Sequence, residues 1–236
     1  MNVFSRAVRK VQRLVLSDLY ERLGQVEYNA FNRRFYAVEQ VAEYLVGAQI
    51  PGDYVEFGVY EGRTFSHACN LMGLLFPKMR FVACDSFEGL PAPKGLDADR
   101  GYSSHFYERQ FSCSKDQFLS NLAKKGVDLT RVLTIEGWFN KTLTESKRME
   151  LGLPKLACAW IDCDLYESTI PVLKFITPML SVGSVVLFDD WRCFRNLPDY
   201  GQQRAVREWL QANPKIRLAE LLSFGWNGLA FSVLEC

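Results

Sequence analysis

Four aspartates that could bind a metal ion or move a proton follow two short apolar runs of the sequence. They are Asp162, Asp164, Asp189 and Asp190. The apolar runs, residues 157–161 and 185–188, have the length and composition of buried strands. If both strands lie in one open parallel sheet, their carboxyl ends meet at the edge where such sheets bind ligands. Clustered carboxylates repel one another without a cation, and oxygen ligands suit Mg²⁺, Mn²⁺ or Ca²⁺. The sequence therefore predicts a hard divalent cation at this edge.

A glycine loop after an earlier apolar run has residues typical of a cofactor-binding turn. It contains Glu56, Gly58 and Gly62, so its glycines lie four residues apart. The G-x-G-x-x-G spacing that seats a pyrophosphate on a helix N-terminus is absent. The Glu-x-Gly-x-x-x-Gly pattern resembles the first motif of class I S-adenosylmethionine methyltransferases, whose cofactor carries no phosphate. Strand-to-helix turns also need glycine for steric reasons alone, which is the alternative interpretation.

Asp85 and Ser86 end the next apolar run and place a second polar group at the level of the glycine loop. An acidic residue in this position accepts both ribose hydroxyls in nucleotide-binding α/β folds. The alternative is a turn or helix-capping aspartate that binds only the backbone. The glycine loop upstream favours the ribose-binding interpretation.

Apolar runs alternate with helical patterns from Asp53 onward. The predicted strands are residues 54–57, 80–84, 132–135, 156–161 and 185–188. This alternation predicts a Rossmann-like α/β fold with a mostly parallel, seven-stranded sheet and helices on both faces. Residues 217–223 and 229–234 predict a C-terminal antiparallel hairpin. We expect one domain over residues 51–236, preceded by a helical extension over residues 1–50 that acts as a lid or in assembly.

The first 23 residues have the pattern of an amphipathic helix with one basic side. Such a helix can lie on an anionic membrane surface, but it packs more often against its own domain or a second subunit. We therefore expect packing, and with it a homo-oligomer with at most weak membrane contact. Residues 90–111 form a long aromatic segment of the kind that serves as a lid. This segment contains His105, an alternative candidate for a catalytic base.

Composition limits the classes of function that remain. The chain has 236 residues, 48% of them hydrophobic, and a net charge of +1, which argues against a nucleic-acid partner. No apolar stretch reaches the ~20 residues of a membrane span, and the basic start lacks the apolar core of a signal peptide. The seven cysteines are scattered, without a C-x-x-C pair. We expect a cytoplasmic protein with reduced thiols.

Four blocks of sequence together are similar to the macrocin O-methyltransferases and their aminocoumarin and macrolide relatives. The blocks are Asp85–Pro91, Gly137–Phe139 with Thr142–Leu143, Ile161–Thr169 and Asp189–Trp191. They follow the order of the family between Gly52 and the C-terminus, and the D-x-D-x-Y-E-S-T block is the most specific. The resemblance implies a transferase that methylates a hydroxyl of a sugar, in a small molecule or a glycan, with S-adenosylmethionine and Mg²⁺ or Mn²⁺.

The resemblance also implies roles for single residues. The implied metal ligands are Asp162, Asp189 and Asp190, and the implied catalytic base is Asp164. The implied cofactor contacts are Glu56, Gly58, Gly62, Asp85, Ser86, Gly137, Trp138 and Asp162. The chain departs from the family at Cys163, where glycine is common, and in the loop Arg192–Gly201. That loop and residues 90–111 are expected to face the acceptor.

Two other functions stay open at this level. A catechol-like phenol could chelate the same metal through its two oxygens and take the place of the sugar. A membrane-surface binding protein could keep a vestigial cofactor pocket and bind through its basic first helix. The D-x-D-x-Y-E-S-T block favours the sugar over the phenol. The intact set of carboxylates argues against a vestigial pocket, because an unneeded buried acidic cluster is costly to keep.

Overall fold

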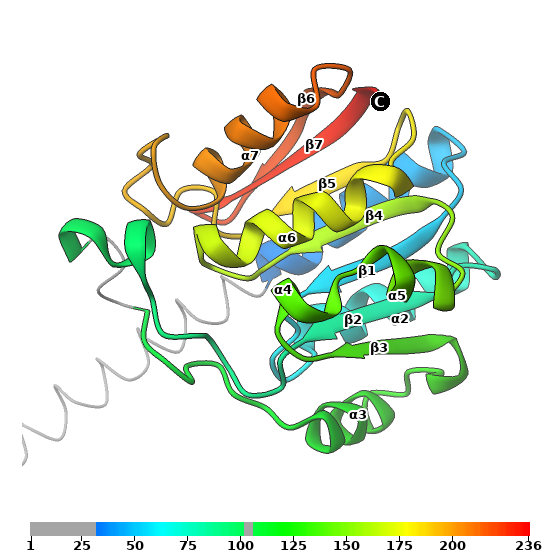
Figure 1. The fold of residues 1–236 in the computed structure, drawn as a ribbon. Helices are drawn as coiled ribbons and strands as arrows, with labels where there is room; N and C mark the ends of the chain where they lie inside the picture. The colour runs from blue at the N-terminus through cyan, green and yellow to red at the C-terminus, as the bar shows by residue number, and fades with distance from the viewer. Residues whose placement is uncertain (1–31, 102–105) are drawn as a thin grey trace, which may run out of the picture.

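The computed structural model describes residues 32–101 and 106–236, which form one seven-stranded sheet covered by helices (Figure 1). The strands are β1 (Asp53–Phe57), β2 (Phe81–Asp85), β3 (Val132–Glu136), β4 (Leu156–Ile161), β5 (Val185–Phe188), β6 (Arg217–Phe224) and β7 (Gly228–Glu235). Their order across the sheet is β3-β2-β1-β4-β5-β7-β6. Strands β1 to β5 run parallel, and β7 pairs antiparallel with both β5 and β6. The predicted fold class and the C-terminal hairpin are confirmed.

Two hydrophobic cores cover the two faces of the sheet, because alternate residues of each strand point in opposite directions. The helices are a helix over residues 32–47, α2 (Arg63–Leu75), α3 (Lys115–Lys124), α4 (Phe139–Thr142), α5 (Glu145–Glu150), α6 (Tyr166–Ile176) and α7 (Gly201–Ala212). The helix over residues 32–47, α2 and α3 bury side chains in the core that contains Tyr54. Helices α6 and α7 bury theirs with the adjacent Val55 on the other face. Short 3₁₀ turns complete the chain: η1 (Gly95–Gly101), η2 (Leu129–Arg131) and η3 (Thr177–Met179).

The helix over residues 32–47 belongs to the core of the domain. Its apolar residues Ala37, Val38, Val41 and Leu45 are at most 1% exposed and pack with strands of the sheet. The extension predicted over residues 1–50 is thus divided: this helix is part of the main core, whereas the amphipathic pattern of residues 1–23 lies outside the described residues. In the described part of the chain, no helix is both long and apolar enough to cross a bilayer.

The two ends of residues 90–111 are hydrogen-bonded to each other. The backbone N–H of Leu90 donates to the carbonyl of Gln110 (2.9 Å), and the N–H of Arg109 donates to the carbonyl of Leu90 (2.9 Å). Within the segment, the carboxylate of Asp97 accepts the first free N–H groups of α6, from Tyr166 (2.8 Å) and Glu167 (3.0 Å). Asp97 is therefore the N-terminal cap of a helix far away in the sequence.

Gly58 lets the ends of β1 and β4 approach each other. Its φ is +86°, and a Cβ built on it would lie 1.9 Å from the carbonyl oxygen of Asp162. The backbone N–H of Asp162 donates to the carbonyl of Phe57 (2.9 Å), so the sheet pairing continues up to this point. Any side chain here would push apart the two strand ends that carry the predicted site.

We expect Gly58→Ala to destabilise the protein by about 2–4 kcal/mol, because it combines an unfavourable φ with a backbone clash. Urea unfolding followed by circular dichroism measures the change. The control is Gly47→Ala, since Gly47 is helical and has no atom within 4 Å of a built Cβ. That substitution should be neutral or mildly stabilising. Equal stability of the two variants would contradict the packing role of Gly58.

Candidate active site

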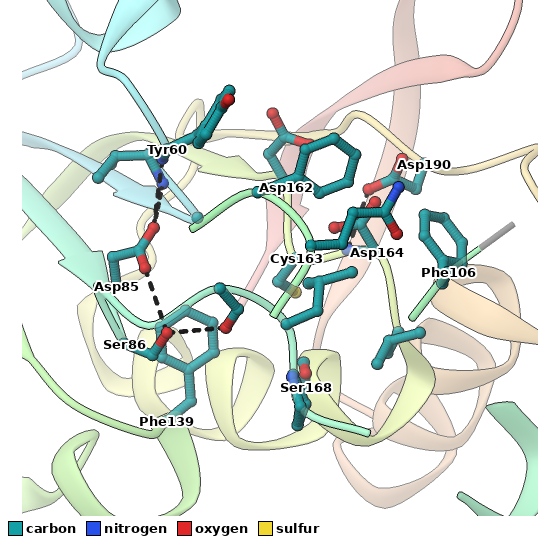
Figure 2. Close-up of a pocket in the computed structure, with 18 of the residues that line it drawn as sticks. Tyr60, Asp85, Ser86, Phe106, Phe139, Asp162, Cys163, Asp164, Ser168 and Asp190 are labelled. Atoms are coloured by element: carbon teal, nitrogen blue, oxygen red, sulfur yellow. Dashed lines mark hydrogen bonds between the residues drawn. The ribbon is translucent and has the colours of Figure 1, made fainter. Parts of the chain in front are cut away.

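One cavity of about 1250 Å³ lies beyond the carboxyl ends of the central strands. Nine of the predicted site residues line it: Glu56, Gly58, Asp85, Ser86, Gly137, Trp138, Asp162, Asp164 and Asp190. Figure 2 shows Asp85 and Ser86 at one side of this pocket and Asp164 and Asp190 at the other. Pockets for one small ligand measure roughly 300–1,000 Å³, so this cavity has room for two ligands.

Asp85 joins the end of β2 to the glycine loop. One carboxylate oxygen, Oδ2, accepts the backbone N–H of Val59 (2.8 Å) and Tyr60 (3.3 Å), and Oδ1 accepts that of Phe87 (2.8 Å). Burial raises the pKa of Asp85, and these N–H groups oppose the rise. Both alternatives for Asp85 are therefore compatible: the carboxylate already organises two turns, and it also faces the cavity. The hydroxyl of Ser86 is used locally, since it donates to the carbonyl of Gly89 (2.8 Å).

Glu56 lies under the floor of the cavity, in the middle of the sheet. It is 1% exposed, and its carboxylate accepts the hydroxyl of Tyr54 (2.5 Å). Burial raises the pKa of Glu56 to about 8, although the hydrogen bond from Tyr54 lowers it. Below that pH, Glu56 keeps its proton and can itself donate a hydrogen bond toward the cavity.

Two of the predicted glycines have different surroundings. Gly137, with φ +121°, follows β3 and lines the cavity together with Trp138. Gly62, with φ +77°, begins α2 and does not line the cavity. A Cβ on Gly62 would meet Phe118 (2.8 Å) and Leu122 (3.0 Å) of α3. Gly62 thus packs between two helices, and its contact with the cofactor stays a prediction.

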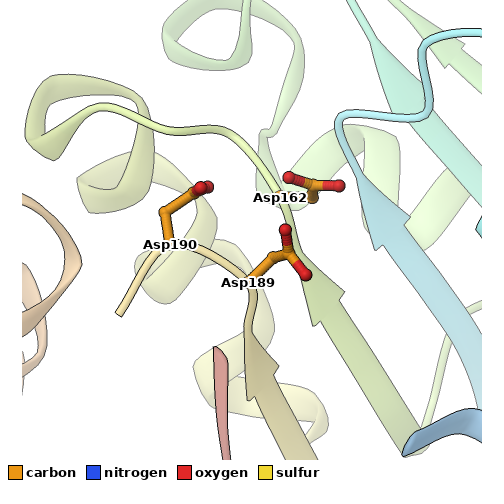
Figure 3. Close-up of side chains that lie close together, drawn as sticks. All are labelled: Asp162, Asp189 and Asp190. Carbon is orange, nitrogen blue, oxygen red and sulfur yellow. The ribbon is translucent and has the colours of Figure 1, made fainter. Parts of the chain in front are cut away.

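Asp162, Asp189 and Asp190 form a compact cluster at the ends of β4 and β5 (Figure 3). One carboxylate oxygen from each lies within 4.8 Å of those of the other two. Burial and the charge of Asp189 raise the pKa of Asp162 well above its ordinary value, and the same two causes raise the pKa of Asp190 to about 7. A proton retained on part of the cluster therefore reduces the repulsion among its carboxylates.

Arg34 supplies positive charge to this cluster from the helix over residues 32–47. Its guanidinium forms a two-pronged ion pair with Asp189, through Nε to Oδ1 (2.9 Å) and through Nη2 to Oδ2. Burial alone would lower the pKa of Arg34, but the nearby carboxylates outweigh that effect and raise it. Sequence analysis did not single out Arg34, because an arginine in an amphipathic helix usually faces solvent.

Asp164 is held beside Asp190 in a strained turn. Its φ is +59°, a value that costs most side chains about 1–2 kcal/mol. Its backbone N–H donates to Oδ2 of Asp190 (3.1 Å), and its own carboxylate lines the cavity. Backbone strain of this kind gathers at functional positions. His105, the other predicted base, lies outside the described residues.

Comparison with known proteins identifies the family. The family model described as macrocin O-methyltransferase (TylF) matches residues 26–214. The chain belongs to the macrocin O-methyltransferase family. Its fold is that of the class I O-methyltransferases: it superposes on the O-methyltransferase NovP with a TM-score of 0.69 at 25% identity, over 86% of this chain and 80% of that one. The calicheamicin methyltransferase CalS11 gives a TM-score of 0.68 at 25% identity, over 84% and 77% of the two chains.

Two relatives of this family are similar in sequence as well. The chain is 32% identical to demethyldecarbamoylnovobiocin O-methyltransferase of Streptomyces niveus over 166 residues. These residues make up 67% of this chain and 60% of the relative. It is 31% identical over 165 residues, again 67% and 60%, to the 8-demethyl-8-(2,3-dimethoxy-alpha-L-rhamnosyl)-tetracenomycin-C 4'-O-methyltransferase of Streptomyces olivaceus. The matched region thus spans about 60% of the length of these relatives.

Gln202, beside the carboxylate cluster, and Trp226, in the lining of the cavity, were not predicted. Gln202 is fully buried; its Nε2 donates to the carbonyl of Ile161 (3.2 Å), and its Oε1 accepts the N–H of Asp190 (3.0 Å). It therefore ties the ends of β4 and β5 together. Trp226, at the tip of the β6–β7 hairpin, is 66% exposed and lines the cavity. A glutamine in a helix and a tryptophan in a hairpin carry no local signal of either role.

We expect the protein to lose stability as the pH rises from about 5 to about 8, with Glu56 as one cause. The folded-state pKa of Glu56 is about 8, above that of an unfolded chain. In this window the unfolded chain releases a proton that the folded protein keeps, so rising pH favours unfolding. Glu56→Gln keeps an acceptor for Tyr54 and should flatten the decline by about 2–4 kcal/mol.

Urea unfolding at pH 5, 6, 7 and 8 measures this difference. Asp162, Asp164 and Asp190 are present in both proteins, so the comparison isolates Glu56. Glu108→Gln, at an exposed position, is the matched control. Parallel pH profiles for the Glu56→Gln variant and the unsubstituted protein would show that Glu56 is ionised in the folded state at neutral pH.

Proposed function

We propose that this chain is an S-adenosylmethionine-dependent O-methyltransferase that uses a divalent metal ion to methylate a hydroxyl of a sugar moiety. The observation that carries the proposal is that a single cavity joins the glycine-loop end, with Gly58 and Asp85, to the carboxylates Asp162, Asp164 and Asp190. A methyl donor and an acceptor bound in one cavity can meet without crossing solvent. Family membership and the two related folds support the same reaction class.

S-adenosylmethionine would lie at the end of the cavity formed by β1, β2 and β3. Gly58 lets β1 end against the backbone of Asp162 there, and the Asp85 carboxylate would accept ribose hydroxyls. Trp138 and Phe139 follow β3 and line the same end, where an adenine ring needs a flat apolar surface. When bound, the sulfonium of this cofactor supplies the methyl group.

The cluster of Asp162, Asp189 and Asp190 fits a divalent metal ion. Its donors are all carboxylate oxygens close enough to share one ion, which is the ligand set that Mg²⁺ or Mn²⁺ prefers. The guanidinium of Arg34 already lies against Asp189 as a cation of the protein itself. When bound, a divalent ion would orient two neighbouring sugar hydroxyls and lower the pKa of the one that reacts.

Asp164 would take the proton of the acceptor hydroxyl. Burial and the charge of Asp190 raise its pKa well above the ordinary value, which makes it a stronger base than an exposed aspartate. The hydroxyl oxygen then bonds to the methyl carbon while the carbon–sulfur bond breaks, and the sulfur becomes neutral. The other contribution of the chain is alignment, because an in-line displacement depends on the orientation of its two reactants.

The sugar acceptor is supported by the relatives and by the shape of the cavity. The names of two relatives specify a rhamnosyl tetracenomycin and mycinamicin III as substrates. In this chain, Phe106, Phe111 and Trp226 line the cavity beside polar groups. Aromatic rings next to carboxylates suit a glycoside, which presents apolar C–H faces and polar hydroxyl edges.

We expect turnover to stop in EDTA and to return with Mg²⁺ or Mn²⁺, while calorimetry shows that S-adenosylhomocysteine still binds. Asp164→Asn should lower kcat about 10²–10⁴-fold without weakening cofactor binding, because it removes only the base. Asp116→Asn, at an exposed position on α3, is the control. Full activity in the chelator would remove the metal from the mechanism. A catechol methylated as well as a rhamnoside would move the proposal to a phenol acceptor.

We expect Trp226→Ala to raise the Michaelis constant for a glycoside acceptor about 5–10-fold, because an aromatic contact is worth about 1 kcal/mol. The affinity for S-adenosylhomocysteine should stay the same, since Trp226 lies away from Asp85. Trp226→Phe keeps a ring and should retain most of the affinity. An unchanged Michaelis constant in the alanine variant would place the acceptor away from the β6–β7 hairpin.

A further inference from the structure

Arg34 lies between Asp189 and the cavity. Both carboxylate oxygens of Asp189 are bound by its guanidinium, and Asp189 is 0% exposed. Arg34 lines the cavity, as do Asp162 and Asp190, whereas Asp189 does not. A divalent ion entering from the cavity therefore reaches two of the three carboxylates directly and finds the third covered by a positive charge.

The electrostatics of the cluster give Arg34 a second effect on such an ion. Its charge acts on Asp162, Asp164 and Asp190 as well as on its direct partner. The guanidinium therefore neutralises part of the field that would attract a divalent cation, and it repels that cation at short range. Because the site is buried, solvent screens this repulsion only weakly.

We propose that Arg34 is a displaceable counter-cation of the metal site. It holds Asp189 in the metal-free protein and releases at least one oxygen of that carboxylate when a divalent ion binds. The inference rests on the metal ion of the proposed function. It goes further in stating that metal binding is coupled to the helix over residues 32–47.

The packing of this helix limits what the release of Arg34 can move. Ala37, Val38, Val41 and Leu45 anchor the helix in the core, whereas Arg33 and Tyr36 are exposed. The ion pair with Asp189 lies in the first turn of the described helix, ahead of these anchors. An effect of displacement is therefore expected near Arg34 and not in the remainder of the helix.

The opposite role for Arg34 makes the opposite prediction. If the guanidinium were a permanent support that orients Asp189 toward the metal, its removal would disorder a ligand and weaken metal binding. If it competes with the metal, its removal exposes Asp189 and strengthens metal binding. The sign of the change in affinity separates the two roles.

The first experiment measures Mn²⁺ binding by electron paramagnetic resonance, in the full chain without acceptor. We expect Arg34→Gln to bind Mn²⁺ at least about 10-fold more tightly than the unsubstituted protein, because a competing charge has been removed. Arg33→Gln lies one residue away, is exposed, and should not change the affinity. Unchanged or weaker binding by the Arg34→Gln variant would overturn the proposal.

The second experiment needs no substitution, which matters because unpaired carboxylates could prevent Arg34→Gln from folding. Hydrogen exchange of the unsubstituted protein is measured by mass spectrometry with and without Mn²⁺. We expect faster exchange in a peptide covering residues 32–40 when Mn²⁺ is present, and no change in a peptide from α3. Slower or identical exchange in residues 32–40 on Mn²⁺ binding would overturn the proposal.

Asp190→Asn separates a failure of this inference from a failure of the proposed function. Loss of Mn²⁺ binding in Asp190→Asn, together with equal binding by the Arg34→Gln variant and the unsubstituted protein, would reject only the role of Arg34. An unsubstituted protein that binds no Mn²⁺ would reject the metal part of the proposed function, and the role of Arg34 with it.

Discussion

The level register of β1, β4 and β5 is the constraint on which the site depends. Phe57 pairs with Ile161, and Ile161 pairs with Phe188, so the three strands end at the same height. The residues that follow these strand ends therefore emerge side by side, with Gly58 against the backbone of Asp162. A shift of one residue in either pairing would turn the carboxylates to the other face of the sheet. The register of the parallel sheet therefore brings the three carboxylates together.

The second constraint is electrostatic, and it follows from the first. Strand ends that bring Asp162, Asp189 and Asp190 within reach of one ion also bury three like charges together. Such a cluster is stable only with protons or a cation, because isolated buried carboxylates are costly. In this chain the guanidinium of Arg34 supplies a cation, and the raised pKa of Asp190 favours a retained proton. The helix over residues 32–47 is therefore part of the site as well as of the core.

How much of the fold and of the site could be predicted from the sequence depends on whether the interacting residues are close together in the chain. The strands and the carboxylates at their ends follow from short apolar runs and from the geometry of parallel sheets, so the fold class was predicted correctly. Arg34 binds Asp189 from one helix, and Gln202 binds the backbone of Asp190 from another. The apolar pattern of each helix predicts which face is buried, but it does not predict these polar contacts. Gly62 matched a motif, but its spacing could not distinguish contact with a cofactor from packing against α3. Interactions between distant elements carry no periodic signal.

The two ends of the cavity are built from different kinds of element, and this difference decides how freely each end can change in sequence. The Asp85 end consists of strand ends and tight turns, where a backbone clash or a lost N–H bond disturbs the whole sheet. The opposite end is lined by side chains from a loop and a hairpin tip, such as Phe106 and Trp226, and Phe106 packs against Phe194 at a ring distance of 6.0 Å. Loops tolerate substitution better than the elements they connect. The residues at the opposite end can therefore change while the strand ends and their carboxylates stay fixed.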